Sequence, residues 1–280
     1  MLRIVTDGAA DVPLEWQKEF GIEICPVNIL FGEKTYLQGI ELDNEGFYKL
    51  VDDTKKIPKT SQPTPHQFSE LYKKIAQPGD TILSIHVTSK LSGTYASAVA
   101  AGRELAGTFN VIPFDSASGS MAIGYMCRSA RRMERAGHSL DEIITHLEGM
   151  RANGRLVLAL DTLDYARMSG RVGTMQAALA SVLNVKPIAI LKDGLLAMTE
   201  KVRTRKASLE RLITMIKDET GDKPVMMAIL HARDPKAGQE LLEQARSRFN
   251  VKEIYLIELS ISLAANFGPG TVGIVALPAE

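Results

Sequence analysis

The sequence predicts an α/β protein with two domains, and three observations support this prediction. The chain has 280 residues, which is enough for two domains of ordinary size. Over residues 1–152, short apolar runs alternate with loops and helical patterns, which is typical of a mostly parallel, doubly wound sheet with crossover helices. Residues 153–280 show a different succession of apolar runs, turns and helical patterns, which favours a mixed or antiparallel sheet with helices. We place the boundary in Met150–Arg155, where Gly154 and polar residues interrupt the pattern.

The elements of the first domain follow from local patterns. Apolar runs that end in loop residues predict strands, and apolar residues three and four positions apart predict helices. The expected strands are Leu2–Val5, Ile22–Leu30, Thr81–Val87 and Asn110–Phe114. The expected helices are Asn44–Val51 with Asp43 or Asn44 as its cap, Phe68–Ile75, Thr94–Leu105 and Met121–Arg135. The segment Lys59–Pro65 is expected to be a loop, because two prolines so close together cannot lie inside a helix.

The second domain is expected to contain more strands than helices. Its expected strands are Leu156–Leu160, Lys186–Leu191, Leu195–Val202, Val225–His231 and Glu253–Glu258. Helices are expected at Thr162–Met168 and Pro235–Phe249. The pair Asp193-Gly194 between two of the strands predicts a tight antiparallel hairpin, because both positions of such a turn favour residues that adopt positive φ.

The composition limits the possible partners and the compartment. Lys+Arg and Asp+Glu both number 33, so the balance does not favour a nucleic-acid partner and allows at most transient membrane contact. The two cysteines, Cys25 and Cys127, lack metal-ligand spacing and are expected to be buried thiols in a reducing compartment. The sequence shows neither a signal-peptide pattern nor an apolar run of about 18 residues, so a cytoplasmic location is expected.

The sequence lacks the common motifs of nucleotide, metal and nucleophilic catalysis. It contains no P-loop, no G-x-S-x-G elbow and no H-E-x-x-H, and its five histidines lack metal-ligand spacing. We therefore expect no metal and no cofactor. The string Gly268-Pro269-Gly270-Thr271-Val272-Gly273 matches G-x-G-x-x-G, but only seven residues follow it, too few for the βαβ unit of a dinucleotide site. A tight loop that approaches a ligand or a neighbouring loop is the better interpretation.

Hydroxyl groups gather in loops that follow the expected parallel strands. Ser92-Gly93-Thr94 opens a helix, where backbone N–H groups and the helix dipole favour an anion. Thr60-Ser61 precedes another helix and could join it. Ser92 or Thr94 could instead simply cap the helix, and the two roles are compatible. A carboxylate or a phosphate oxygen would fit such a site.

Charged residues suggest two further roles. Arg203-Thr204-Arg205-Lys206 and Arg171 are either solvated side chains or a contact for an acidic partner or a phosphate. Asp7 and Asp115 follow strands and could bind a cation, although turn and capping roles are commoner at such positions.

Taken together, short motifs along the whole chain resemble the DegV family of fatty-acid-binding proteins, which includes the binding subunits of bacterial fatty acid kinase. The matching segments, in family order, are Val5–Val12, Lys59–Pro63, Ser89–Tyr95, Phe114–Ser116, Leu163–Gly173, Val185–Pro187 with Asp193-Gly194, Arg203–Lys206 and Gly268–Gly270. Each segment is short, and their joint occurrence in order makes the match specific.

The resemblance implies a fatty acid threaded into an apolar tunnel, with its carboxylate at the domain interface. It implies that Thr60 and Ser92 bind the carboxylate, with Ser61 and Gly93 close by. It also implies that a separate kinase subunit phosphorylates the bound acid to an acyl phosphate for phospholipid synthesis, so that this chain is a non-catalytic binding subunit. Arg171, Arg203 and Arg205 would then contact the partner or a phosphate.

Two positions depart from the family pattern. Many members have a histidine in the carboxylate network where this chain has Asn266, which can donate a hydrogen bond but carries no charge. The usual T-D-S of the first loop is Thr6-Asp7-Gly8 here, which removes one hydroxyl.

Two other functions remain open. The protein could be a lipid carrier or sensor without a kinase partner. It could also be a stand-alone hydrolase or phosphotransferase that uses Asp7, Asp115 and His231.

Overall fold

The computed structural model describes residues 1–171 and 185–279 of the chain. The chain divides into two units, Met1–Ala152 and Asn153–Glu280, and each has its own central sheet and its own helices. Among the described residues, no helix combines the length and the apolar character needed to cross a bilayer.

The first unit has a four-stranded parallel sheet and a separate three-stranded sheet. Its strands are β1 (Leu2–Asp7), β2 (Ile22–Cys25), β3 (Asn28–Phe31), β4 (Lys34–Leu37), β5 (Lys59–Ser61), β6 (Thr81–His86) and β7 (Asn110–Asp115). Its helices are α1 (Leu14–Phe20), α2 (Asn44–Thr54), α3 (Pro65–Ile75), α4 (Thr94–Glu104), α5 (Met121–Arg135) and α6 (Leu140–Asn153), the last of which reaches the boundary.

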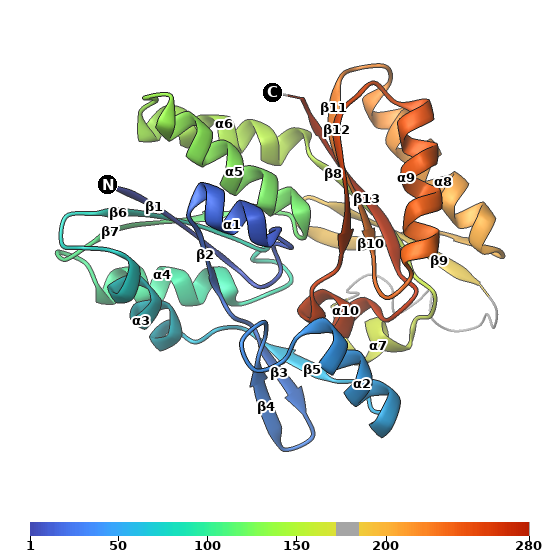
Figure 1. The fold of residues 1–280 in the computed structure, drawn as a ribbon, viewed down its shortest axis with the longest axis horizontal. Helices are drawn as coiled ribbons and strands as arrows, with labels where there is room; N and C mark the ends of the chain where they lie inside the picture. Colours follow the sequence, from blue (N-terminus) through green and yellow to red (C-terminus); the bar gives the residue numbers. More distant parts are fainter. Residues whose placement is uncertain (172–184, 280) are drawn as a thin grey trace. The chain divides into compact units, whose positions relative to one another are not determined.

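The parallel sheet has the strand order β2-β1-β6-β7 and is covered by helices on both faces (Figure 1). Helices α3 and α4 pack on one face, where Phe68, Tyr72 and Ala98 join Val5 and Ile82 in a buried core. Helices α1 and α5 lie on the other face (Figure 1). Sheets with two covered faces have apolar strands and expose their loops at the strand ends, so the prediction of a doubly wound parallel sheet is confirmed.

The three-stranded sheet, in the order β4-β3-β5, was not predicted. Ile22–Leu30 was expected to be one strand, but it is two strands in different sheets, separated by Pro26 and Val27. Proline lacks the N–H that a central strand needs, so the ladder breaks there. The expectation of a loop over Lys59–Pro65 was wrong for Lys59–Ser61, which pair antiparallel with β3. Pro65 does begin a helix, and Thr64 and Gln67 form its capping box.

The second unit contains a six-stranded mixed sheet. Its strands are β8 (Arg155–Ala159), β9 (Lys186–Lys192), β10 (Leu195–Val202), β11 (Val225–His231), β12 (Val251–Glu258) and β13 (Val272–Pro278). Its helices are α7 (Asp164–Ser169), α8 (Arg205–Thr220), α9 (Pro235–Arg248) and α10 (Ile261–Phe267).

This sheet has the order β10-β9-β8-β13-β11-β12, and only β11 and β12 pair in parallel. The prediction of a mixed or antiparallel sheet is therefore confirmed. Asp193 (φ 51°) and Gly194 (φ 76°) form the predicted hairpin turn between β9 and β10. Leucine and isoleucine side chains of α8 and α9 pack on one face of the sheet in a single buried cluster.

No bounds were predicted from the sequence for α1, α6, α8, α10, β4 and β13. The expected helix Thr162–Met168 begins two residues later, at Asp164. Of the matching segment Leu163–Gly173, Val172 and Gly173 lie outside the described residues. Both cysteines are buried and unpaired, as expected, and burial raises the pKa of each thiol far above its usual range.

Candidate functional site

The carboxyl ends of β1, β6 and β7 bring three loops of the first unit to one edge of the parallel sheet. These loops are held together by backbone hydrogen bonds. Ser116 N–H donates to the His86 carbonyl (3.1 Å), and Thr88 N–H donates to the Ser118 carbonyl (2.9 Å). The Asp115 carboxylate accepts from Ser89 N–H (3.2 Å). The loop that leads to Ser92 is therefore fixed at several points.

Ser92 and Thr94 place two hydroxyls at the start of α4. Their oxygens lie 2.8 Å apart. The N-cap residue is neither of them but Gly93, which has no side chain with which to cap the helix. Ser92 Oγ accepts from Thr94 N–H at 3.3 Å, a long hydrogen bond. The two hydroxyls thus stand at the positive end of an 11-residue helix whose cap position supplies no acceptor.

Thr60 and Ser61 lie next to one another on β5, so their side chains point to opposite faces. Thr60 is opposite Ile29, which is fully buried, and is itself half-buried. Ser61 is opposite Asn28 and is exposed. Of the two predicted hydroxyls, Thr60 therefore shares the covered face of the small sheet.

The segment after β5 lies against the start of α4. The Gln62 side chain packs so tightly on Gly93 that a Cβ at that glycine would overlap its amide group. Asn28 Nδ2 donates to the Gln62 carbonyl (3.1 Å) and so holds the segment from the other side. The structure therefore places Gln62, which follows Thr60-Ser61, against Gly93, which follows Ser92, although about thirty residues separate the two segments in the sequence.

The loop after β1 is completed by Gln38, a residue that the sequence did not suggest. Gln38 Nε2 donates to the Gly8 carbonyl (2.6 Å), and a Cβ on Gly8 would lie 2.8 Å from the same atom. The space that a serine side chain would need at position 8 is thus filled by an amide. The hydroxyl lost at Gly8 is replaced by a different polar group.

In the second unit, the loop Gly268-Pro269-Gly270 joins α10 to β13, a helix followed by a strand. This order is the reverse of the strand-then-helix of a dinucleotide fingerprint. Gly268 (φ 83°) lies against the Tyr165 ring, and Gly270 (φ 79°) lies against Asp161. The interpretation of a tight loop in close contact with its neighbours is confirmed.

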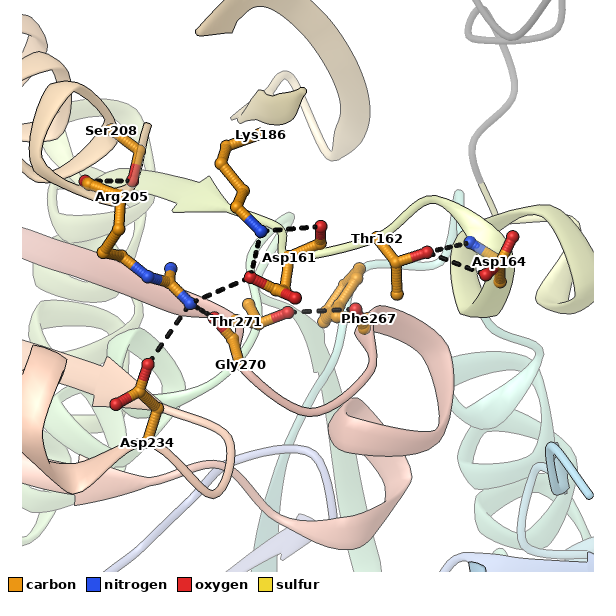
Figure 2. Close-up of polar contacts among 10 residues, drawn as sticks. All are labelled: Asp161, Thr162, Asp164, Lys186, Arg205, Ser208, Asp234, Phe267, Gly270 and Thr271. Carbon is orange, nitrogen blue, oxygen red and sulfur yellow. Dashed lines mark hydrogen bonds and ion pairs between the residues drawn. The ribbon is translucent and has the colours of Figure 1, made fainter. Parts of the chain in front are cut away.

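Four charged side chains surround Gly270, and Figure 2 shows how they converge. Arg205 Nη2 contacts Asp161 Oδ1 (3.3 Å) and Asp234 Oδ2 (3.2 Å) and donates to the Gly270 carbonyl. Lys186 Nζ donates to the Asp161 carboxylate and to its backbone carbonyl. Two cations thus face two carboxylates, so the formal charge of the cluster is balanced.

Asn266 lies near the end of α10, one turn beyond Ser262. One N–H of its side-chain amide donates to the Ser262 carbonyl (2.6 Å). An amide carries two N–H donors, so a second remains for another acceptor. The residue is half-buried.

The three predicted arginines differ in their surroundings. Arg205 is held in the charged cluster around Gly270. Arg171 Nη1 donates to the Ser169 carbonyl at the end of α7 (2.6 Å). Arg203 is exposed.

Of the three residues of the enzyme alternative, Asp7 and Asp115 hold backbone N–H groups of their own loops. Asp7 is fully buried and accepts hydrogen bonds from Ala9 N–H, Val87 N–H and His86 Nδ1. Asp115 accepts from Ser89 N–H and Ala117 N–H. His231 is buried at the end of β11, and burial lowers its pKa against the opposing effect of Glu258 and Asp234. No group of three or more metal-ligating side chains gathers in the described part of the chain.

Comparison with known proteins identifies the family. The family model described as "Uncharacterised protein, DegV family" matches residues 1–279. The chain belongs to the DegV family. It is 33% identical to a DegV domain-containing protein of Streptomyces coelicolor over 97% of this chain and 96% of the relative. It is 32% identical to the protein DegV of Bacillus subtilis, over 98% of both chains.

Solved DegV structures share the whole fold. A DegV family protein from Thermus thermophilus, described by its fatty acid binding, has a TM-score of 0.90 at 29% identity and 99% coverage of both chains. DegV of Bacillus subtilis, described as a fatty acid binding protein, has a TM-score of 0.88 at 30% identity and the same coverage. A stearic acid-binding protein from Eubacterium ventriosum has a TM-score of 0.91 at 26% identity, with 99% of this chain and 98% of that chain covered. The resemblance and the fold class predicted from the sequence are confirmed.

Proposed function

We propose that this DegV protein binds one long-chain fatty acid in an apolar tunnel and presents its carboxylate to a separate fatty acid kinase. The observation that carries the proposal is the contact of Gln62, which follows Thr60-Ser61, with Gly93, which follows Ser92. The fatty acid binding by which the DegV structures of Thermus thermophilus and Bacillus subtilis are described, and the stearic acid named for the Eubacterium ventriosum protein, support the same ligand class.

The energetics of a fatty acid suit a site with few polar groups. About 14 buried methylenes at about 0.8 kcal/mol each contribute about 11 kcal/mol before the costs of association. Those costs remove several kcal/mol. Two or three hydroxyl or N–H donors are then enough to orient the carboxylate.

Each proposed carboxylate ligand has a defined role. Ser92 donates its hydroxyl, and Gly93, which has no side chain, lets the Gln62 segment approach the start of α4 closely. Thr60 donates a second hydroxyl, whereas the exposed Ser61 contributes through its backbone. Asn266 is proposed to offer the amide N–H that Ser262 does not use.

Presentation to a kinase needs no catalytic group on this chain. In such a reaction the kinase would bind ATP, a carboxylate oxygen of the fatty acid would attack the γ-phosphorus, and the bond to ADP would break to give acyl phosphate and ADP. Arg203 is exposed and is the best proposed contact for the kinase or its phosphate, with Arg171 beside α7 as a second. Arg205 is proposed to act indirectly, because Nη2 of its guanidinium is already engaged by Asp161, Asp234 and Gly270.

One observation favours a second function, that of a lipid carrier or sensor without a kinase. The resemblance to the family implies a histidine in many members at the position of Asn266, and an amide cannot carry a charge during phosphoryl transfer. The carrier would bind fatty acid equally well, but no kinase subunit would phosphorylate it.

Titration calorimetry with palmitate tests the head-group assignment. Thr60→Val and Ser92→Ala each remove a hydrogen bond to a charged group, so each is expected to weaken binding about 10- to 100-fold. Ser61→Ala is the matched control and is expected to bind like the wild type. Unchanged affinity in the double variant Thr60→Val/Ser92→Ala would refute the assignment. Incubation of the loaded protein with ATP and a bacterial fatty acid kinase subunit then separates the two functions by the appearance of acyl phosphate.

A further inference from the structure

Four buried side chains form a continuous chain of hydrogen bonds beneath the loop edge of the parallel sheet. Asp7 Oδ2 lies 3.0 Å from His86 Nδ1, His86 Nε2 lies 2.6 Å from Ser84 Oγ, and Ser84 Oγ lies 2.7 Å from Tyr72 Oη. All four side chains have an exposed fraction of 0%. They come from β1, β6 and α3, so the chain crosses from the sheet to a covering helix.

The hydrogen-bond inventory determines the direction of this chain. Asp7 Oδ2 already accepts from Val87 N–H, so an ionised Asp7 needs the proton to be on His86 Nδ1. His86 Nε2 then accepts from the Ser84 hydroxyl, and Ser84 in turn accepts from the Tyr72 hydroxyl. Each donor has an acceptor in this arrangement. With the ring proton on Nε2 instead, Ser84 would accept from both His86 and Tyr72, and no member of the chain would accept from the Ser84 hydroxyl.

The constellation contains the Asp, His and Ser of a hydrolytic triad, but its surroundings exclude that use in this conformation. Ser84 Oγ is in contact with Tyr72 Oη and is fully buried, so no substrate reaches it. A triad serine must face a reacting carbonyl. The role of these hydrogen-bonded side chains instead depends on the backbone N–H groups that Asp7 holds in place.

Asp7 connects these buried, hydrogen-bonded side chains to the loop that carries Ser92. Its Oδ1 accepts from Ala9 N–H (2.9 Å) and its Oδ2 from Val87 N–H (3.0 Å), so one carboxylate fixes the loops after β1 and β6. The next residue, Thr88, accepts at its carbonyl from both Leu91 N–H and Ser92 N–H (3.2 Å each). The position of Ser92 therefore depends on a turn that begins one residue after the Asp7 contact.

We infer that Asp7 and His86 are positioning residues for the carboxylate site, with His86 held as the Nδ1–H tautomer by Ser84 and Tyr72. This inference rests on the proposed fatty-acid function and extends it to residues that never touch the ligand. Buried networks of this kind fix geometry when every member is satisfied. A shift of about 1 Å in a positioned group is enough to weaken its interaction strongly.

Asp7→Asn is the sharpest perturbation, because asparagine keeps the shape but replaces one acceptor by a donor. Its amide cannot accept from Ala9, Val87 and His86 as the carboxylate does. The amide oxygen keeps two donors when it faces Val87 N–H and His86 Nδ1–H, so the NH₂ group then faces Ala9 N–H and that hydrogen bond is lost. The neutral oxygen also accepts more weakly than a carboxylate, so the variant is expected to keep the Nδ1–H tautomer but to loosen the loop that carries Ser92.

Two measurements on the full chain test the inference. The ¹⁵N NMR spectrum of histidine-labelled wild-type protein without added lipid is expected to show a buried His86 in the Nδ1–H form, and Asp7→Asn is expected to keep that form. Titration calorimetry with palmitate is expected to show at least a tenfold loss of affinity in Asp7→Asn. Ser84→Ala keeps all three hydrogen-bond donors to Asp7, so it is expected to lose less palmitate affinity than Asp7→Asn. If Asp7→Asn does not fold, Ser84→Ala takes its place in the calorimetry.

Asp80→Asn is the matched control. Asp80 is a buried carboxylate at the opposite end of β6, where it holds the N-terminus and Arg3. This variant is expected to lower the melting temperature but to leave palmitate affinity unchanged. An Nε2–H tautomer in the wild type, or an affinity loss in Asp80→Asn equal to that in Asp7→Asn at similar stability, would overturn the inference. A wild type with the expected tautomer that binds no palmitate would instead refute the proposed function, and the positioning role with it.

Discussion

Gly268→Ala should destabilise the second unit far more than an ordinary glycine substitution. Gly268 has φ 83° and ψ 161°, a region that only glycine occupies readily, so alanine there costs about 1–3 kcal/mol. The new Cβ would also lie 2.7 Å from Tyr165 Cδ2, and such overpacking costs about another 1–3 kcal/mol. The expected loss is therefore about 2–6 kcal/mol in the free energy of unfolding.

Gly170→Ala separates the backbone effect from the steric effect. Gly170 ends α7 in the left-handed region (φ 69°, ψ 9°), and a Cβ there would meet no atom within 4 Å, so only about 1 kcal/mol should be lost. Urea unfolding followed by far-UV circular dichroism compares the two variants. The combination Gly268→Ala/Tyr165→Ala should show a favourable coupling of about 1–2 kcal/mol, because removal of the ring relieves the clash. Equal losses for Gly268→Ala and Gly170→Ala would refute the steric argument.

Three further predictions concern the pH dependence of stability, helix capping and the charged cluster. Burial lowers the pKa of His231, so the unfolded chain binds the proton first, and stability should fall as the pH drops below about 6.5. Urea midpoints at pH 7.5 and 5.5 should show this loss to be smaller in His231→Gln than in the wild type, and an equal loss in the two proteins would contradict the prediction. Thr64→Ala removes the capping box of α3 and should cost about 1 kcal/mol, measured by urea unfolding with the fluorescence of Trp16, the only tryptophan; an unchanged midpoint would contradict the cap. Asp161→Ala removes the acceptor shared by Lys186 and Arg205, so hydrogen exchange at the Gly270 amide should become faster. Unchanged exchange would show that the charged cluster does not hold the loop.

The elements that could be predicted from the sequence were those with complete local signals. Met121–Arg135 has helical spacing over its whole length and is a helix with those bounds. Asp193-Gly194 specifies its hairpin because both residues tolerate positive φ. The strand β13 was not predicted, although its continuous apolar run is typical of a central strand. The glycines that precede it favour a loop, and this signal obscured the start of the strand.

The contacts of the candidate site could be predicted only in part. Hydroxyl residues at a helix start are a local signal, and Ser92 was found by that signal. The contacts of Gln62 with Gly93 and of Gln38 with Gly8 depend on pairings between distant segments, which no local pattern encodes. Glycines at positions of close approach were the one available hint. The charged partners of Arg205 were likewise hidden, because Asp161 and Asp234 belong to different loops.

The most direct test of the central claim is mass spectrometry of the protein purified from cells, first under native conditions and then after denaturation and lipid extraction. The account predicts a native mass that exceeds the chain mass by one fatty acid, and a long-chain fatty acid in the extract. A native mass equal to that of the chain alone, with no uptake of added palmitate, would contradict the proposal that this protein binds fatty acids.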